Sequence, residues 1–192
     1  MKNKPHLILA SASPRRRELL EQINVRYKVC AVDIDETSLI NELPLAYVER
    51  LAAEKSAACL AQHPTTLPIL AADTAVVLGD VIMGKPKDEQ DALTMLRLLS
   101  GQTHQVYSAI SLRGQIHGQA VSMTDVTFRT LTDTEILAYW YSGEPLDKAG
   151  AYAIQGKAAV FVESIRGSFS GVVGLPLFET AQLLFQQGIK IY

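Results

Sequence analysis

The chain has 192 residues, of which 48% are hydrophobic and 20% charged, and its net charge is −2. This composition is typical of one globular domain with a sizeable core, and it argues against a general nucleic-acid binder, which normally carries a basic excess. No run approaches the ~20 apolar residues of a membrane-spanning helix. The apolar run at residues 7–12 is too short for a secretory signal, so we expect a cytoplasmic protein with no membrane association. Cys30 and Cys59 are expected to be free thiols in a reducing compartment.

Strand and helix signals alternate in the first half of the chain. In order, we expect a strand at 6–10, a helix capped by Ser13 and beginning at Pro14, a strand at 27–32, a helix at 44–62, and a hairpin of 68–78 with 81–83. Hairpins dominate the second half. The patterns predict a helix at 88–101, a hairpin of 104–112 with 120–131, a helix with a capping box at 132–143, a hairpin of 160–165 with 169–173, and a last helix at 176–188. The order predicts an α/β domain with a mixed sheet.

Three consecutive arginines, Arg15 to Arg17, occupy the first turn of the helix predicted after Pro14. Cations are unfavourable there because the helix dipole already places positive charge at that end. A phosphate held by backbone amides, by Ser11 and Ser13 and by the guanidinium groups would explain the arrangement. A solvated basic patch is the alternative, and these residues alone do not decide between the two.

Lys55 lies on the apolar face of the helix predicted at 44–62, four residues after Leu51 and four before Cys59. An inward ammonium requires an anion unless its stem reaches solvent. Lys55 is therefore either a ligand contact or a lysine at the edge of the surface. Glu54 can pair with Arg50 on another face of the helix, which favours a structural role for Glu54.

Asp73 interrupts the apolar strand predicted at 68–78. A carboxylate in such a strand must be paired, protonated or bound to a metal, so Asp73 is a candidate general base or metal ligand. The alternative is an aspartate bonded to backbone amides at a strand end. The acidic cluster of Asp33, Asp35 and Glu36 would form an oxygen-ligand site for a divalent cation if it lay beside Asp73, and an ordinary surface turn otherwise.

The segment 79–85 nearly matches a phosphate-binding P-loop, but Pro86 stands where a serine or threonine would hold magnesium. We therefore exclude a P-loop and keep Lys85 as a candidate phosphate contact. The cationic groups suit a polyphosphate and the carboxylates suit a divalent metal, a combination typical of phosphoryl chemistry.

Several longer motifs follow one another along almost the whole chain. They are Ser-Ala-Ser-Pro-Arg-Arg at 11–16, Ala-Asp-Thr at 72–74, Lys-Pro at 85–86, Ser-Gly-Gln-Thr-His at 100–104, the run 144–156, and Val-Gly-Leu-Pro at 173–176. This set resembles the Maf family of nucleotide pyrophosphatases. The resemblance implies hydrolysis of a nucleoside triphosphate to the monophosphate and diphosphate with Mg²⁺ or Mn²⁺. It also implies a mixed twisted sheet with flanking helices and two lobes around a cleft, similar to inosine-triphosphate pyrophosphatases. Residues 1–192 would form a single domain with two lobes, often as a homodimer.

The resemblance also implies roles for individual residues. Asp73 would be the proton acceptor and would hold the metal with Glu36, and the phosphate contacts would be Arg15, Arg16, Lys55 and Lys85. Members that prefer dTTP and UTP resemble this chain in the residues that influence substrate choice: Arg15, Thr74 and Gln155. The chain departs from many members after Gly156, where Lys157, Ala158 and Ala159 replace glycines.

In the mechanism expected from these roles, the cations clamp the triphosphate and Asp73 deprotonates a water that attacks the α-phosphorus. Gln155 would contact the edge of the base, and Thr74 would shape that end of the site. Two alternatives stay open. One is a non-catalytic nucleotide-binding regulator of cell division, which would keep the cations and lose the carboxylates. The other is a pyrophosphatase of the same type for purine triphosphates or 7-methyl-GTP, for which Lys157 leaves room.

Overall fold

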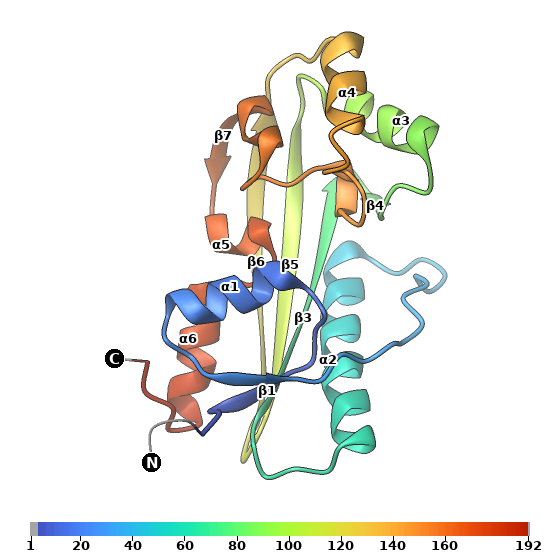
Figure 1. Ribbon diagram of the computed structural model, residues 1–192. Helices are drawn as coiled ribbons and strands as arrows, with labels where there is room; N and C mark the ends of the chain where they lie inside the picture. The colour runs from blue at the N-terminus through green and yellow to red at the C-terminus, as the bar shows by residue number, and fades with distance from the viewer. Residues whose placement is uncertain (1–3, 192) are drawn as a thin grey trace.

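A seven-stranded mixed sheet forms the centre of the computed structural model, which describes residues 4–191 (Figure 1). The strands are β1 (Leu7–Leu9), β2 (Tyr27–Val29), β3 (Ile69–Leu78), β4 (Val81–Met83), β5 (Thr103–Arg113), β6 (His117–Phe128) and β7 (Val162–Arg166). Their order is β2-β1-β3-β5-β6-β7, and β4 pairs with β3 outside this path. The β1 strand is parallel to β2 and β3, whereas β3, β5, β6 and β7 follow one another as antiparallel neighbours. The predicted α/β fold with a mixed sheet is confirmed.

Helices pack at both ends of the long strands β3, β5 and β6. The helices are α1 (Pro14–Gln22), α2 (Pro44–Gln62), α3 (Glu89–Leu99), α4 (Asp133–Trp140), α5 (Phe169–Val173) and α6 (Leu177–Gln186), and the short 3₁₀ helices are η1 (Ala149–Ala151) and η2 (Lys157–Phe161). Figure 1 shows α1, α2 and α6 around the lower part of these strands and α3 and α4 around the upper part. The interpretation as one domain with two lobes stays a prediction.

The largest apolar cluster joins the sheet to the helices at both ends. It includes Leu70 and Ile110 from the central strands, Leu20 from α1, Leu96 from α3 and Leu184 from α6, all fully buried. Each such side chain stabilises the fold by roughly 1.5–3 kcal/mol relative to an exposed one. This shared core holds the loops between the two ends in defined positions.

Most of the predicted helices and strands are present, and the residues predicted to start α4 and α1 lie at the starts of these helices. Thr132 and Glu135 form the predicted capping box at the start of α4. Ser13 precedes α1 as predicted, but its side chain makes no capping hydrogen bond.

Cys30 and Cys59 are free thiols. No helix in the described part of the chain is long and apolar enough to cross a membrane.

The prediction of a strand at 169–173 is wrong, because these residues form the short helix α5. Gly167 has a φ of 138°, which redirects the chain after β7. Ser168 then caps α5, since its hydroxyl accepts a hydrogen bond from the Gly171 amide at 3.0 Å. β7 pairs with β6 instead of with this segment.

Candidate functional site

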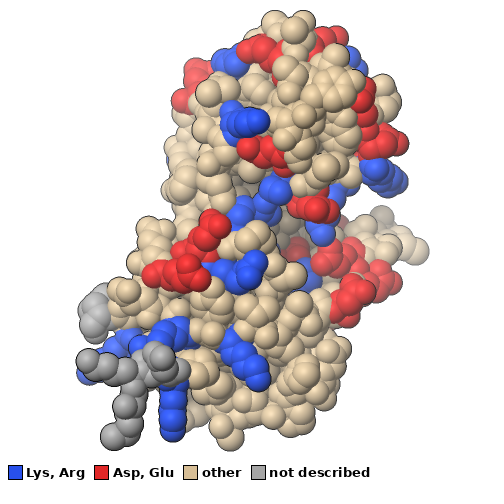
Figure 2. All heavy atoms as spheres, in the orientation of Figure 1, with Lys and Arg blue, Asp and Glu red and all other residues tan. Residues whose placement is uncertain are grey.

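A cleft with a cavity of about 650 Å³ opens beside β3. All residues that the sequence predicted for the site line it: Ser11, Ser13, Arg15, Arg16, Glu36, Lys55, Asp73, Thr74, Lys85 and Gln155. Figure 2 shows positive and negative side chains gathered where the surface is hollowed between the upper and lower parts of the molecule. The fold thus brings together residues that lie far apart in the sequence.

The cleft exists because the two strands beside β3 leave a gap. β1 pairs with β3 only as far as Leu70, and β4 pairs with it only from Val76 onward. Asp73 and Thr74 lie in this gap, and successive residues of a strand point to opposite faces. The short length of β1 and the hairpin to β4 therefore open the edge of β3 where the polar residues begin.

Glu36, Lys55 and Asp73 form a group of paired charges, here called the Lys55 cluster. The Lys55 ammonium lies 2.6 Å from Asp73 Oδ1 and 2.6 Å from Glu36 Oε1. Lys55 is only 8% exposed and Asp73 only 6%. Lys55 is thus an inward lysine paired with protein carboxylates, and Asp73 is ion-paired. That Lys55 contacts a ligand stays a prediction. The Arg50–Glu54 pair on the outer face of α2 is also present, at 3.2 Å.

The charges around Glu36 determine its protonation. Burial acts to raise the pKa of Glu36, but its hydrogen bond with Lys55 and the charges of Lys55, Lys85 and Arg16 lower the pKa overall. Glu36 is therefore a carboxylate at neutral pH, available to a cation.

Arg16 connects three segments of the chain. Its Nε donates to the Gly174 carbonyl at 2.8 Å, Nη1 donates to Ser11 Oγ at 3.1 Å, and Nη2 donates to Thr74 Oγ1 at 3.4 Å. Burial lowers the pKa of Arg16, and the charge of Asp73 partly offsets this. Arg16 thus shapes the cleft as well as charging it.

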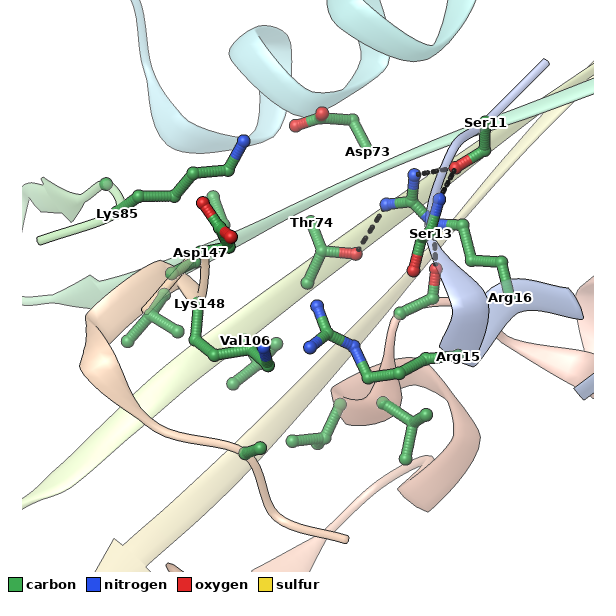
Figure 3. A pocket seen from close by; sticks show the side chains of 18 of the residues that line it. Ser11, Ser13, Arg15, Arg16, Asp73, Thr74, Lys85, Val106, Asp147 and Lys148 are labelled. Carbon is green, nitrogen blue, oxygen red and sulfur yellow. Dashed lines mark hydrogen bonds between the residues drawn. The ribbon is translucent and has the colours of Figure 1, made fainter. Parts of the chain in front are cut away.

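Arg15 and Lys85 are much less engaged. The Arg15 guanidinium makes no hydrogen bond within residues 4–191, although Glu18 and Asp147 act on it electrostatically. Figure 3 shows Arg15 pointing into the cavity near Thr74, and Lys85 directing its ammonium toward Asp73 from the opposite side. These two cations are available to an anionic ligand.

The hydroxyl of Thr74 has a defined direction. Ser108, its partner across β3 and β5, donates its one hydroxyl proton to the Gly171 carbonyl at 2.6 Å. Thr74 must therefore donate its own proton to Ser108, whose Oγ lies 2.9 Å away. The Thr74 oxygen is left as an acceptor. The sequence analysis missed Ser108, and a buried serine in a strand offers no local signal of such a role.

Asp147 and Lys148 also line the cavity, and the sequence analysis gave them no role. Asp147 has a φ of 61°, a left-handed conformation that a non-glycine residue seldom adopts. Burial and the charge of Arg15 lower the pKa of Lys148. Their place in the long motif at 144–156 was the available signal.

The structure bears on the predicted divalent-cation site and on the segment 79–85, which was excluded as a P-loop. Among residues 4–191, no three or more His, Cys, Asp or Glu side chains gather as a metal site. Of the predicted acidic cluster, Asp33 and Glu36 line the cavity, whereas the Asp35 carboxylate accepts a hydrogen bond from the Thr37 amide at 2.9 Å. Residues 79–85 form a turn and β4, as expected for a segment that is not a P-loop.

Comparison with known proteins gives closely similar sequences. Residues 6–187 match the family described as Maf-like protein. A protein of Myxococcus xanthus named dTTP/UTP pyrophosphatase is 52% identical over 185 residues, which cover 96% of this chain and 94% of that protein. A protein of Methylococcus capsulatus with the same name is 53% identical over 184 residues, with 95% and 91% covered. Among solved structures, the Ham1 protein of Staphylococcus aureus aligns with a TM-score of 0.45 and 18% identity, over 66% of this chain and 72% of that one.

Proposed function

Because this chain belongs to the family of Maf-like proteins, we propose that it hydrolyses dTTP and UTP to the nucleoside monophosphate and diphosphate. The observation that carries the proposal is that Arg15, Thr74 and Gln155 line the same cavity as the Lys55 cluster. Cations for a triphosphate, carboxylates for a base and a metal, and polar groups for a nucleobase all face one space. The names of relatives about half identical in sequence support the same substrates.

The phosphates bind at the cationic side of the cleft. Arg15 and Lys85 contact them directly, because neither cation is committed to a close partner within residues 4–191. The partly buried Arg16 and the buried Lys55 contribute further charge, and the hydroxyl groups of Ser11 and Ser13 complete the contacts. Charge-assisted bonds of this kind are roughly twice as strong as neutral ones.

Asp73 is the proton acceptor. It takes a proton from a water whose oxygen forms a bond to the α-phosphorus, while the bond from that phosphorus to the bridging oxygen breaks. The diphosphate leaves with the bonding electron pair. Lys55 and Lys85 lie close enough to the Asp73 side of the cleft to offset the charge that develops on the leaving group.

The Lys55 cluster fits a divalent cation, Mg²⁺ or Mn²⁺. Glu36 and Asp73 direct one oxygen each at the same ammonium, so they form a two-carboxylate set of the kind Mg²⁺ uses together with substrate phosphates. Bound there, the ion would supply positive charge to the phosphate oxygens. Lys55 would then turn one or both of its bonds from the carboxylates to the phosphates.

The nucleobase lies toward Gln155, and Thr74 shapes the same end of the site. An amide offers one donor and one acceptor side by side, which matches the edge of uracil or thymine. A site that hydrogen-bonds a base rejects analogues without the matching groups more strongly than an apolar pocket does. The resemblance to the family adds to this proposal a homodimer in the cytoplasm.

The test is phosphorus NMR of the purified protein with Mg²⁺ or Mn²⁺ and, in turn, dTTP, UTP, CTP, GTP and 7-methyl-GTP. We expect diphosphate and monophosphate from dTTP and UTP. The same products from a purine triphosphate or 7-methyl-GTP alone would keep the reaction and overturn the proposed base. Orthophosphate, or binding without turnover, would overturn the reaction and favour a nucleotide-binding regulator.

A further inference from the structure

Gln155 lies in a short segment, the 153–158 loop, whose second half is bonded to one carboxylate. Glu144 Oε2 accepts a hydrogen bond from the Lys157 amide at 2.9 Å, and Oε1 accepts one from the Ala158 amide at 3.3 Å. Burial acts to raise the pKa of Glu144, but these backbone bonds and the bond from Tyr139 lower it overall. The ionised carboxylate therefore holds the start of η2.

The first half of the same loop is bonded to Tyr139, which is itself bonded to Glu144. The Tyr139 hydroxyl donates to Glu144 Oε1 at 2.8 Å and accepts from the Ala153 amide at 3.2 Å. The Tyr139 ring is buried and packs edge-on against Phe161, with ring centroids 5.1 Å apart. One rigid phenol and one carboxylate thus hold both ends of the loop.

Gly156 lets the loop cross directly over this carboxylate. A Cβ at Gly156 would overlap the carboxyl carbon and both carboxylate oxygens of Glu144. The loop and the carboxylate are therefore in close contact, and any larger residue at this position would push them apart.

Only Ile154, Gln155 and Gly156 lie between the two anchored ends. The Ile154 side chain is buried and Gly156 has none, so among these three residues Gln155 carries the one exposed side chain, and it lines the cavity. We propose that Glu144, acting with Tyr139, is a positioning residue that holds Gln155 in place at the base end of the cavity, so that Gln155 can contribute to the choice between uracil or thymine and cytosine. The inference rests on the proposed function and adds a residue that determines its specificity.

The test compares kcat and KM for UTP and CTP in wild type and in Glu144→Gln. The substitution keeps the size of the side chain but replaces one acceptor oxygen with a donor, so at least one of the three groups that donate to Glu144 loses its acceptor. We expect the ratio of kcat/KM for UTP to that for CTP to fall about 10-fold. The loss should come from a higher KM for UTP, with kcat changed less than two-fold. Glu163→Gln on the exposed strand β7 is the matched control and should leave the ratio unchanged.

A double-mutant cycle separates positioning from a general structural effect. If Glu144 acts through Gln155, adding Glu144→Gln to Gln155→Ala should change the UTP-to-CTP ratio by less than two-fold. Two losses that multiply in the double variant would overturn the inference while leaving the proposed function intact. A wild-type protein that hydrolyses neither UTP nor dTTP would overturn both.

Tyr139→Phe provides a second variant if Glu144→Gln fails to fold. It keeps the packed ring and removes only the hydroxyl that links Ala153 to Glu144, so we expect a smaller loss of the ratio, about 3-fold. Tyr141→Phe is the control, because Tyr141 is 71% exposed at the end of α4. An unchanged ratio in a folded Tyr139→Phe variant would overturn the part of the inference that assigns a role to Tyr139.

Discussion

The two sides of the cleft are held by different kinds of interaction. The Lys55 cluster joins three charged side chains, with two carboxylates from a loop and β3 paired to one ammonium from α2. The 153–158 loop is held by backbone amides that donate to Glu144 and Tyr139. Removing one partner of a buried ion pair costs roughly 3–5 kcal/mol, whereas losing one ordinary hydrogen bond costs about 1 kcal/mol. Changes to the cluster should therefore affect reaction rate and stability, and changes to the loop should affect selectivity.

The largest effect is expected at the centre of the Lys55 cluster. Asp73→Asn should reduce kcat roughly 10²–10⁴-fold, because the amide cannot accept the proton of the attacking water. Nucleotide binding should persist, and calorimetry beside steady-state rates measures both. Asp125→Asn on β6, whose carboxylate pairs with the exposed Arg166, is the control and should retain full activity. Normal turnover by Asp73→Asn would show that the rate does not depend on this side of the cleft.

Removing the cation of the cluster should destabilise the protein. Lys55→Met leaves Glu36 and Asp73 facing each other without a positive charge, and we expect a loss of about 3 kcal/mol in the free energy of unfolding. Added Mg²⁺ should restore part of this loss and stabilise the variant more than wild type, since the ion can take the place of the ammonium. Urea unfolding with and without Mg²⁺ measures both effects, with the exposed Lys28→Met as control. Equal stabilisation of variant and wild type by Mg²⁺ would count against a metal between these carboxylates.

The loop side should show its own dependence on pH, through His104. His104 Nε2 lies 2.8 Å from the hydroxyl of Tyr152, which precedes the 153–158 loop, and burial lowers the pKa of His104 to about 4. Because this value lies below the ordinary 6.5, the unfolded chain binds a proton between these pH values and the folded one does not. Stability should therefore fall as pH falls, by about 2 kcal/mol between pH 7.5 and pH 5 from this group.

His104→Gln should remove that part of the pH dependence, measured by urea unfolding at the two pH values. The exposed His63→Gln should keep it, because His63 lies at the C-terminal end of α2 away from this contact. If His104→Gln and wild type lose the same stability between the two pH values, the histidine is not held neutral by burial.

A smaller effect than at the cluster is expected between the two sides, at Thr74. Ser108→Ala removes the acceptor of the Thr74 hydroxyl, so Thr74 can rotate or donate elsewhere. We expect kcat/KM for UTP to fall about 5-fold, which corresponds to the loss of one hydrogen bond of ~1 kcal/mol. Ser164→Ala on the exposed β7 is the matched control. An unchanged kcat/KM would mean that Ser108 does not orient Thr74 for the substrate.

The fold was largely predictable because its signals are local. Pro14 and Pro44 mark the starts of two helices, and the capping box at Thr132 marks a third. The helix at 169–173 was predicted as a strand because Phe-Ser-Gly-Val-Val fits a short strand as well as a short helix. A hydrogen bond from Gly171 to Ser168 and the turn at Gly167 decide in favour of the helix.

The sequence by itself also determined which residues belong to the cleft. Charges that violate local preferences, such as Arg15 at a helix start, Lys55 on an apolar face and Asp73 in a strand, all line one cavity. The acidic cluster after the second strand contributed Glu36, and family motifs added Thr74 and Gln155. Burial of an unpaired charge is costly wherever it occurs, so these positions stand out without knowledge of the fold.

Only the tertiary structure decided which groups are partners. Lys55 meets Asp73 across 18 positions of sequence, and Arg16 meets the Gly174 carbonyl across 158. The roles of Ser108, Tyr139 and Glu144 likewise depend on hydrogen bonds to residues elsewhere in the chain, and no local sequence pattern predicts these bonds. Hydrogen bonds depend on distances of about 3 Å and on direction, and packing of the sheet and helices sets both.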